Sequence, residues 1–283
     1  MKISVIIRSH NDENIIRRTL AALCAQKTAA ELELLSFDDA STDGTASIIR
    51  EFPQVRMVPH DGKPYNPPRT LNRAIAEATG EWIIFNNSDA VPLGDDYIEK
   101  LTAPLADPAV GAVYGNQLPR PDAFVLVRKD NLRAFGDGTV AASWEYMFSL
   151  VSSGCRRKTA LEFPFDPAFQ YSEDIDWSLR LRRAGLKIVY VPEARVEHSH
   201  NYPDAQLRKR FYNEGQANGR LYRSRPSWAR FIVATGMEML RDIIFMLRSG
   251  EPGQLSRGLR YRWSQRVSAY RGESDYYKEN KGA

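Results

Sequence analysis

The segment EWIIFNNSDAVP at residues 81–92 joins an apolar run directly to a cluster of amides, a serine and an aspartate. The run at 81–85 is typical of a buried strand. Because Asn, Ser and Asp compete well for turn backbone, the cluster at 86–89 is compatible with a simple turn. It is equally compatible with a ligand site, since open α/β sheets bind ligands at the carboxyl ends of their strands.

Short apolar runs alternate with helical patterns through the first 115 residues. This alternation predicts an α/β fold, in which a mostly parallel, twisted sheet is flanked by helices. The strands are expected at 2–7, 32–37, 55–58, 81–85 and 110–115, and the helices at 16–23, 46–52, 69–80 and 95–107.

The second half of the chain is less regular. A strand is expected at 123–129 and a helix at 143–154. The segment SEDIDWSLRLRRAG at 172–185 predicts a helix that Ser172 caps and Gly185 ends, and short strands follow at 187–191 and 194–198. Beyond residue 202 the pattern becomes helical and basic. We therefore expect a catalytic domain over 1–203 and a helical C-terminal extension over 204–283.

The charge of the chain is unevenly distributed. Residues 201–283 hold 16 Lys and Arg against 8 Asp and Glu, a net charge of +8, whereas the first 200 residues hold 23 against 27, a net charge of −4. A basic and aromatic extension suggests an anionic partner, such as a membrane surface, a nucleic acid or an acidic protein. A solvated helical face is the alternative explanation.

Several classes of protein are not supported by the sequence. Cys24 and Cys155 provide neither a disulfide framework nor a metal-binding spacing. No apolar run approaches the roughly 20 residues that span a bilayer, and the amino terminus lacks a signal-peptide pattern. These features favour a reducing cytoplasm as the location of the protein.

Polar clusters follow three of the expected strands, at 8–12 (RSHND), 38–45 (DDASTDGT) and 86–89 (NNSD). In a parallel sheet these ends share one edge and can converge on one ligand. The dinucleotide-binding and P-loop glycine patterns are both missing from the sequence. A phosphorylated ligand beside these carboxylates requires a divalent cation, and hard oxygen ligands suit Mg²⁺ or Mn²⁺.

The order of these motifs resembles that of the family 2 glycosyltransferases, which have the GT-A fold and transfer a sugar from a nucleotide sugar with inversion. The resemblance covers roughly residues 2–200. It rests on SVIIRSHNDENIIRRTLAAL, FDDASTDGTASII, RTLNRAIAEATGEWIIFNNSDA, SEDIDWSLRLRRAG and KIVYVPEARVEHSH, which occur in the family's order. The resemblance implies a nucleotide-sugar-binding half over about 1–115 and an acceptor half over 116–203.

The resemblance also implies which residues contact the donor. Asp39 matches the aspartate that recognises the nucleotide base, and Arg8 and Ser9 match the strand end that lines the same pocket. Arg69 is a candidate phosphate or base contact, and Ser88 is a further candidate contact with the nucleotide sugar.

A metal site, holding Mg²⁺ or Mn²⁺, is implied at NNSDA. Asp89 is the retained carboxylate of the family's D-x-D motif, but Asn87 replaces its first acidic residue. Because an amide supplies an oxygen but no charge, this departure predicts weaker metal binding. His198 matches the position of a further metal ligand in many relatives, and His200 is its competitor.

The catalytic base implied by the resemblance is Asp174, which takes a proton from the acceptor hydroxyl while the metal stabilises the leaving diphosphate. Glu173 and Asp176 are expected to be helix-start and structural residues. Hexosyl or deoxyhexosyl transfer to a glycan or glycolipid in surface polysaccharide assembly is the expected activity. A nucleotidyltransferase and a non-catalytic nucleotide- or sugar-binding relative are the alternatives.

The extension contains an amphipathic helical pattern at 226–248. This pattern is compatible with packing on the catalytic domain, with a homodimer, and with peripheral contact at the inner face of a membrane. Nucleic acid is not an expected partner.

Overall fold

The computed structural model describes residues 1–140, 144, 146–223 and 225–280. The chain divides into two compact units. We call Met1–Arg120 with Asn131–Ser199 the sheet unit, and Pro121–Asp130 with His200–Ala283 the helical unit. The domain boundaries expected from the sequence stay a prediction.

The sheet unit is built on a mixed sheet, whose eight described strands follow the order β3-β2-β1-β4-β7-β6-β8-β5. The run from β3 to β4 is parallel, as is the pair β6 and β8, whereas β7 is antiparallel to both its neighbours and β5 is antiparallel to β8. The strands are β1 (Lys2–Ser9), β2 (Glu31–Asp38), β3 (Val55–Val58), β4 (Trp82–Asn87), β5 (Val91–Pro92), β6 (Val110–Leu118), β7 (Ser152–Arg156) and β8 (Lys187–Glu197).

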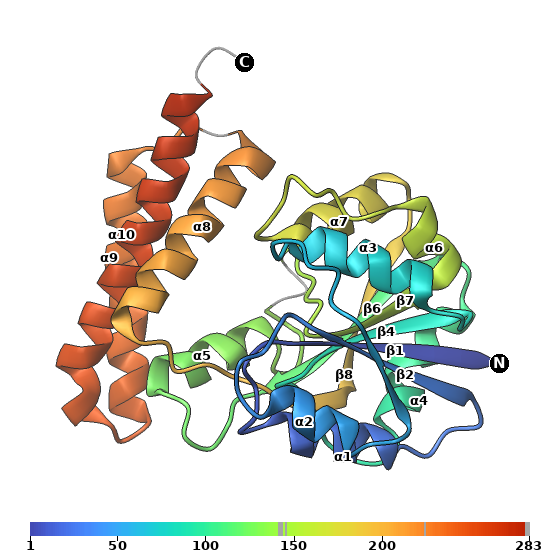
Figure 1. Cartoon of the computed structure of the whole chain (residues 1–283). Helices are drawn as coiled ribbons and strands as arrows, with labels where there is room; N and C mark the ends of the chain where they lie inside the picture. The colour runs from blue at the N-terminus through green and yellow to red at the C-terminus, as the bar shows by residue number, and fades with distance from the viewer. Residues whose placement is uncertain (141–143, 145, 224, 281–283) are drawn as a thin grey trace. The chain divides into compact units, whose positions relative to one another are not determined.

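Helices cover both faces of this sheet, as the sequence predicts. Figure 1 shows α1, α2 and α4 on one side of the strands and α3, α6 and α7 on the other. Their bounds are α1 (Ile16–Cys24), α2 (Thr45–Arg50), α3 (Pro67–Glu77), α4 (Tyr97–Thr102), α6 (Arg157–Glu162) and α7 (Glu173–Arg183).

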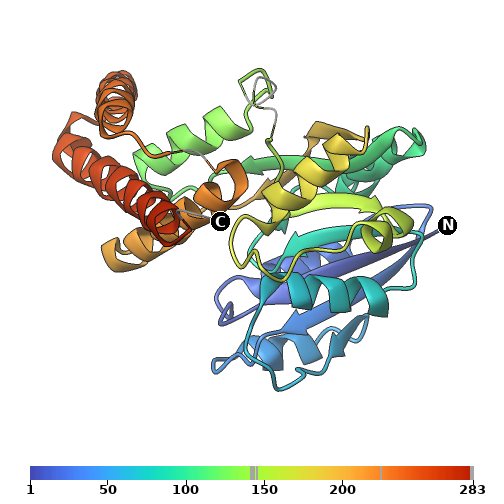
Figure 2. The ribbon, with the colours of Figure 1, turned by 90° about the horizontal axis from the view of Figure 1, so that it is seen from above.

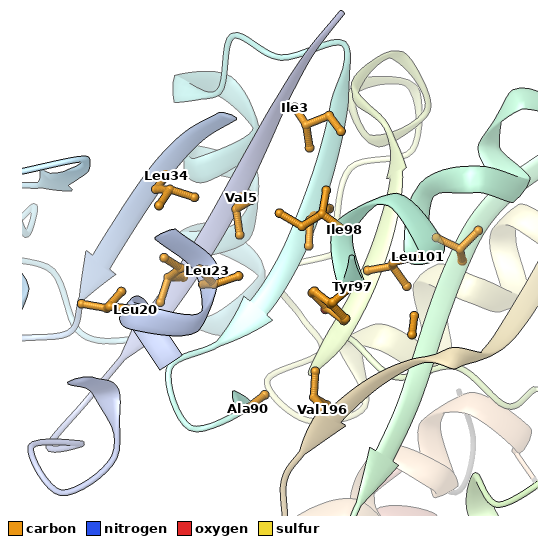
Figure 3. Close-up of a cluster of buried hydrophobic side chains, with 14 of the residues drawn as sticks. Ile3, Val5, Leu20, Leu23, Leu34, Ala90, Tyr97, Ile98, Leu101 and Val196 are labelled. Carbon is orange, nitrogen blue, oxygen red and sulfur yellow. The ribbon is translucent and has the colours of Figure 1, made fainter. Parts of the chain in front are cut away.

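Each covered face has its own hydrophobic core. On one face, Leu20 and Leu23 of α1 and Ile98 of α4 pack toward Val5 of β1, and all four side chains are fully buried. Figure 3 shows these side chains converging from both helices on the strands. The opposite core is built from α3, α6 and α7, with Trp177 as its largest buried side chain. The helical spacing read in the sequence therefore marks the faces that hold the helices on the sheet.

Two expected elements are wrong. The apolar run at 123–129 is mostly part of a helix, α5 (Val125–Ala134), because a short apolar run suits a buried helix as well as a strand. The segment 143–154 lacks the expected helix over its described residues, and its end enters β7; residues 143 and 145 lie outside the described residues. The residues of β7 are mainly small and give no β-branched signal, and at Gly154 an added Cβ would lie 3.2 Å from the carbonyl oxygen of Ile83 in β4.

The start of α7 also differs from the expected cap. Ser172 has φ 58°, in the left-handed region, and its side chain makes no capping hydrogen bond. Gly185 follows the helix with φ 83°, which glycine adopts without steric cost, so the expected helix end is confirmed.

The helical unit consists mainly of three long helices, α8 (Asp204–Tyr222), α9 (Trp228–Arg248) and α10 (Leu255–Glu279). Figure 2 shows α10 running beside its neighbours, and it packs against both α8 and α9. The α8 and α10 backbones approach closely at two glycines: a Cβ on Gly272 would lie 2.0 Å from the carbonyl oxygen of Tyr212, and a Cβ on Gly215 would lie 2.0 Å from that of Ala269. The helical extension expected from the sequence is thus confirmed. None of the described helices has the combined length and hydropathy that crossing a bilayer requires.

We expect Leu20→Ala to lower the free energy of unfolding by about 2–5 kcal/mol, because it opens a cavity in a core whose strands lead to the polar sheet edge. Leu161→Ala is the matched control, since Leu161 is 50% exposed and Leu20 is fully buried. Urea unfolding of both variants tests this prediction. Equal losses in the two variants would contradict the described core.

Candidate active site

The strand ends β1, β2 and β4 meet at one edge of the sheet. Ser9 lies opposite Asp38 in the pairing of β1 with β2, and Arg8 lies opposite Asn87 in the pairing of β1 with β4. The hydroxyl of Ser9 donates to Asp38 Oδ1 at 2.9 Å. The structure therefore brings together polar side chains that are far apart in the sequence.

A pocket opens beside the end of β2. Its lining includes Asp39, His60, Tyr65, Arg69 and Arg73. A ring nitrogen of His60 lies 3.2 Å from Asp39 Oδ1, and Nδ1 of His10 lies 2.7 Å from the Asp39 carbonyl oxygen. An aromatic ring, cations and a carboxylate in one concave site suit a ligand that has both a flat ring and negative charge.

Arg69 belongs to the first turn of α3. Asn66 caps this helix by accepting a hydrogen bond from the Arg69 backbone N–H at 3.1 Å. The exposed Arg69 side chain lines the same pocket as Asp39. Two residues that the sequence predicts to contact the donor thus share one pocket, although their roles stay a prediction.

The turn after β4 is held by buried hydrogen bonds. Asn86 donates to the carbonyl oxygen of Ala90 at 2.9 Å and accepts from the Tyr97 hydroxyl at 3.1 Å. Ser88 is buried, and its hydroxyl donates to Asp12 Oδ2 at 2.5 Å. Burial raises the pKa of the Asp12 carboxyl. The serine therefore fixes the turn to the segment that follows β1.

Asp89 and His198 lie side by side. Asp89 Oδ2 is 3.5 Å from His198 Nε2, and each residue is only 8% exposed. The two belong to segments more than 100 residues apart, which β4 and β8 carry to the same edge. A carboxylate oxygen and an imidazole nitrogen are ligands that a divalent transition metal such as Mn²⁺ accepts.

The orientation of the His198 ring follows from its second nitrogen. Gln117 donates through its amide nitrogen to Ser149 Oγ at 2.9 Å, which turns its Oε1 toward His198. His198 Nδ1 lies 2.9 Å from this oxygen and therefore donates to it. The neutral ring then keeps a lone pair on Nε2, the atom that faces Asp89. This arrangement fits a metal ligand.

A positive charge already lies beside Asp89. Nη2 of Arg120 is 3.6 Å from Asp89 Oδ2 and donates to the Asp89 carbonyl oxygen at 2.9 Å. This cation partly neutralises the carboxylate and so reduces the charge that it offers to a metal. His200 belongs to the helical unit, and its competition with His198 stays a prediction.

Arg8 connects the β4 end to α7. Its Nη2 donates to Asn87 Oδ1 at 3.1 Å, and its Nη1 lies 3.7 Å from Glu173 Oε1. Both charged side chains are 14% exposed, so solvent screens their attraction only partly. The residue that departs from the D-x-D pattern therefore faces a cation rather than a second carboxylate.

Two adjacent carboxyl groups begin α7. Burial raises the pKa of Glu173 to about 7, with the neighbouring Asp174 adding to the rise and Arg8 opposing it. Burial also raises the pKa of Asp174, against a hydrogen bond of 2.9 Å from the Ile175 backbone N–H and the charge of Arg8. A carboxylate whose pKa is raised is a stronger base once it has lost its proton.

The next residues of α7 have structural partners. Asp176 accepts from Arg180 Nε at 2.9 Å, an ion pair one helical turn apart. Trp177 is fully buried, donates to the Phe163 carbonyl oxygen at 2.6 Å and stacks on Phe165. These contacts agree with the structural role that the sequence predicts for Asp176 and give Trp177 a packing role.

Sequence reasoning missed His60, Arg120 and Gln117. His60 follows β3, the neighbour of β2, so inspection of every parallel strand end would have found it. Gln117 lies near the end of β6 and Arg120 lies just beyond it, whereas the apolar pattern predicts this strand only over 110–115. Their contacts with Asp89 and His198 arise from the pairing of β6 with β8, which the sequence does not show.

A family model described as Glycosyl transferase family 2 matches residues 4–176. The O-antigen chain rhamnosyltransferase RfbN of Salmonella typhimurium is 29% identical over 228 residues, which cover 76% of this chain and 72% of RfbN. The O-antigen chain rhamnosyltransferase WbaN of Salmonella anatum is 29% identical over 67% of this chain and 64% of WbaN.

Solved structures show the same fold. The mannosyltransferase PcManGT of Pyrobaculum calidifontis, in complex with GDP-Man and Mn²⁺, superposes with a TM-score of 0.69 at 18% identity, over 99% of this chain and 88% of PcManGT. The glucosyl-3-phosphoglycerate synthase of Mycobacterium tuberculosis, with Mn²⁺, UDP-glucose and phosphoglyceric acid, gives a TM-score of 0.55 at 20% identity, over 75% of this chain and 78% of the synthase.

We expect Gln117→Leu to weaken Mn²⁺ binding by about 10–100-fold, because His198 loses the acceptor that orients its ring. Calorimetric titration with Mn²⁺ in the presence of a nucleoside diphosphate measures this change. Gln26→Leu is the control, since Gln26 donates to the carbonyl oxygen of Gly94 and does not contact the site. Unchanged Mn²⁺ affinity in Gln117→Leu would contradict the assignment of His198.

Proposed function

Since this chain belongs to glycosyl transferase family 2, we propose that it transfers a hexose or deoxyhexose, with inversion, from a nucleotide sugar to a hydroxyl of a glycan or glycolipid. The family match confirms the resemblance inferred from the motifs, and the structural neighbours confirm the GT-A fold. The chain is therefore a glycosyltransferase, and its particular donor and acceptor belong to the proposal.

The contact of Arg8 with both Asn87 and Glu173 is the observation that carries the proposed chemistry. It joins the D-x-D-like turn after β4 to the helix start where Asp174 lies. A transfer reaction needs a leaving-group site and a base within reach of one sugar, and the contacts of Arg8 support these two segments as their source.

The donor is expected to bind along the edge of the sheet. Asp39 is proposed to accept from the nucleotide base, with Arg69 and His60 in the same pocket. The proposed diphosphate site lies between this pocket and Asn87, where Ser9, Ser88 and Arg8 mark the strand ends. The nucleotide base of the donor would then lie beside β2, and the donor sugar would lie beside β4.

Asp89 and His198 would hold a divalent cation, because an oxygen and a nitrogen acceptor face each other at 3.5 Å. When bound, Mn²⁺ or Mg²⁺ stabilises the negative charge of the departing diphosphate. Two solved neighbours contain Mn²⁺, which supports this ion. Asn87 contributes no charge, so we expect Arg8 to supply part of the positive charge beside the leaving group.

Asp174 is proposed to act as the general base. The acceptor oxygen forms a bond to the anomeric carbon as the bond to the diphosphate breaks, and the proton of the acceptor hydroxyl passes to Asp174. Attack from the face opposite the diphosphate inverts the anomeric centre. Glu173 would contact Arg8, and Asp176 would hold the helix through Arg180.

The names of two relatives narrow the proposed substrate. RfbN and WbaN are O-antigen chain rhamnosyltransferases, which favours a deoxyhexose donor and a growing surface polysaccharide as acceptor. Such an acceptor would place the enzyme on the cytoplasmic side, peripheral to the membrane. A thermal-shift screen of nucleotide sugars with and without Mn²⁺ tests the donor, because a ligand of the folded state raises the melting temperature.

Asp174→Asn is expected to reduce transfer by roughly 10²–10⁴-fold while leaving donor affinity unchanged, because the amide keeps the side-chain shape but cannot take a proton. Release of nucleoside diphosphate in the presence of acceptor glycan measures transfer, and calorimetry measures donor affinity. Asp176→Asn is the matched control on the same helix and should retain most of the activity. Equal activity in the two variants would refute Asp174 as the base, and nucleotide-sugar binding without transfer by the wild type would favour a non-catalytic relative.

Arg8 is expected to shift the pH dependence of transfer. Burial raises the pKa of Asp174 and Arg8 lowers it, so kcat/KM should fall as the pH decreases through this raised pKa. In Arg8→Gln the lowering charge is lost, and the acidic limb of the profile should move to higher pH. The pH profiles of wild type and variant measure this shift. An acidic limb that stays in place or moves to lower pH would contradict the proposed electrostatics.

A further inference from the structure

One side of α9 is apolar and exposed. Val233, Met237, Leu240, Ile244 and Leu247 recur at alternating intervals of four and three residues, and between 42% and 67% of each residue is exposed. This spacing places the five side chains on one stripe of the helix. We call this stripe the α9 face.

A different side of the same helix packs within the helical unit. Phe231, Thr235, Asp242 and Met246 are the buried residues of α9. Helix packing therefore explains this second side and leaves the α9 face unexplained. A surface helix normally has one apolar side, and two of them indicate a second contact.

The charges of α9 are sorted between its sides. Its two acidic residues point inward: Glu238 is 2.7 Å from Lys129, and Asp242 is 2.5 Å from Lys129 and 2.7 Å from Arg262. The side chains of Glu238 and Asp242 are 13% and 0% exposed. Both carboxylates of this helix therefore form ion pairs within the helical unit.

The cations of α9 stay at the surface. Arg230, Arg241 and Arg248 are exposed, and at about 100° per residue they form one row along the border of the α9 face. Arg241 also lies 3.4 Å from Glu238. An apolar stripe bordered by arginines has the composition of a helix that lies in a membrane interface.

We propose that the α9 face binds the surface of an anionic bilayer, with its apolar side chains among the acyl chains and its arginine row on the lipid phosphates. The net charge of +8 over residues 201–283, from 16 basic and 8 acidic residues, adds a longer-range attraction to the same surface. This inference deepens the proposed function, on which it rests for its purpose, by bringing the enzyme to a lipid-linked acceptor.

A second copy of the chain fits this face less well. A two-fold dimer through the α9 face would bring together two arginine rows, and both acidic residues of each α9 are already paired inside the unit. Like charges across such an interface are repulsive. An anionic lipid surface instead provides phosphates for every arginine of the row.

Co-sedimentation of the full chain with vesicles tests the proposal. The protein should bind vesicles of phosphatidylglycerol and phosphatidylcholine in equal parts, and bind vesicles of phosphatidylcholine alone at least tenfold more weakly. High salt should weaken binding to the anionic vesicles. Equal binding to both vesicles, or binding to neither, would overturn the proposal.

Two pairs of substitutions locate the surface. Val233→Glu with Leu240→Glu should reduce binding to the anionic vesicles at least tenfold, because two charges would enter the acyl region. Leu161→Glu is the control on α6, where Leu161 is 50% exposed, and it should leave vesicle binding unchanged. Arg230→Gln with Arg248→Gln should also reduce binding at least tenfold, since each arginine near an anionic surface contributes about fivefold. Arg50→Gln, at an exposed arginine of α2, is the control for that pair.

Lipid-free samples of the same variants separate the remaining outcomes. Light scattering should give the same mass for wild type and Val233→Glu with Leu240→Glu. A wild-type dimer that this double substitution dissociates would assign the α9 face to a second copy and overturn the proposal. Nucleoside diphosphate binding should be retained in all variants, so that loss of vesicle binding is distinguishable from failure of the proposed catalytic function.

Discussion

The guanidinium of Arg8 lies between the amide of Asn87 and the carboxylate of Glu173, and the catalytic account depends on this placement. Arg8 is near the end of β1, which pairs with β2 on one side and β4 on the other. This inner strand of the parallel group therefore holds one cation against both the end of β4 and the start of α7. A parallel strand at this position makes the site possible because its carboxyl end lies between those of both neighbours.

The same cation explains how the chain tolerates its departure from the D-x-D pattern. With Asn87 in place of a carboxylate, one negative charge is absent next to Arg8 and Glu173. Arg8 partly offsets the burial that raises the pKa values of Glu173 and Asp174. A second carboxylate at position 87 would compete with Glu173 for Arg8 and raise these pKa values further. The amide therefore fits the electrostatics of this particular site.

Local sequence patterns predict those features of the sheet unit that depend on residues close together in the chain. The helical spacing of Leu20 and Leu23 marks a buried face, and Gly185 ends α7 through its backbone conformation. Partners distant in sequence were not predictable in this way. Gly154 is part of a strand through the pairing of β7 with β4. Gln117 lies beside His198 because β6 pairs with β8. The family resemblance implies candidate roles for individual residues. The contacts of Arg8 with Asn87 and Glu173 depend on the fold and are not implied by the resemblance.

Anomalous scattering at the manganese edge tests the central claim most directly. The crystals are grown with Mn²⁺ and with the nucleoside diphosphate that the thermal-shift screen selects. The claim is that one carboxylate and one histidine hold the cation while Arg8 lies beside the leaving group. We expect a manganese peak in contact with both Asp89 and His198, and a diphosphate within reach of Arg8. A bound diphosphate with manganese away from either ligand, or with no manganese, would contradict this account.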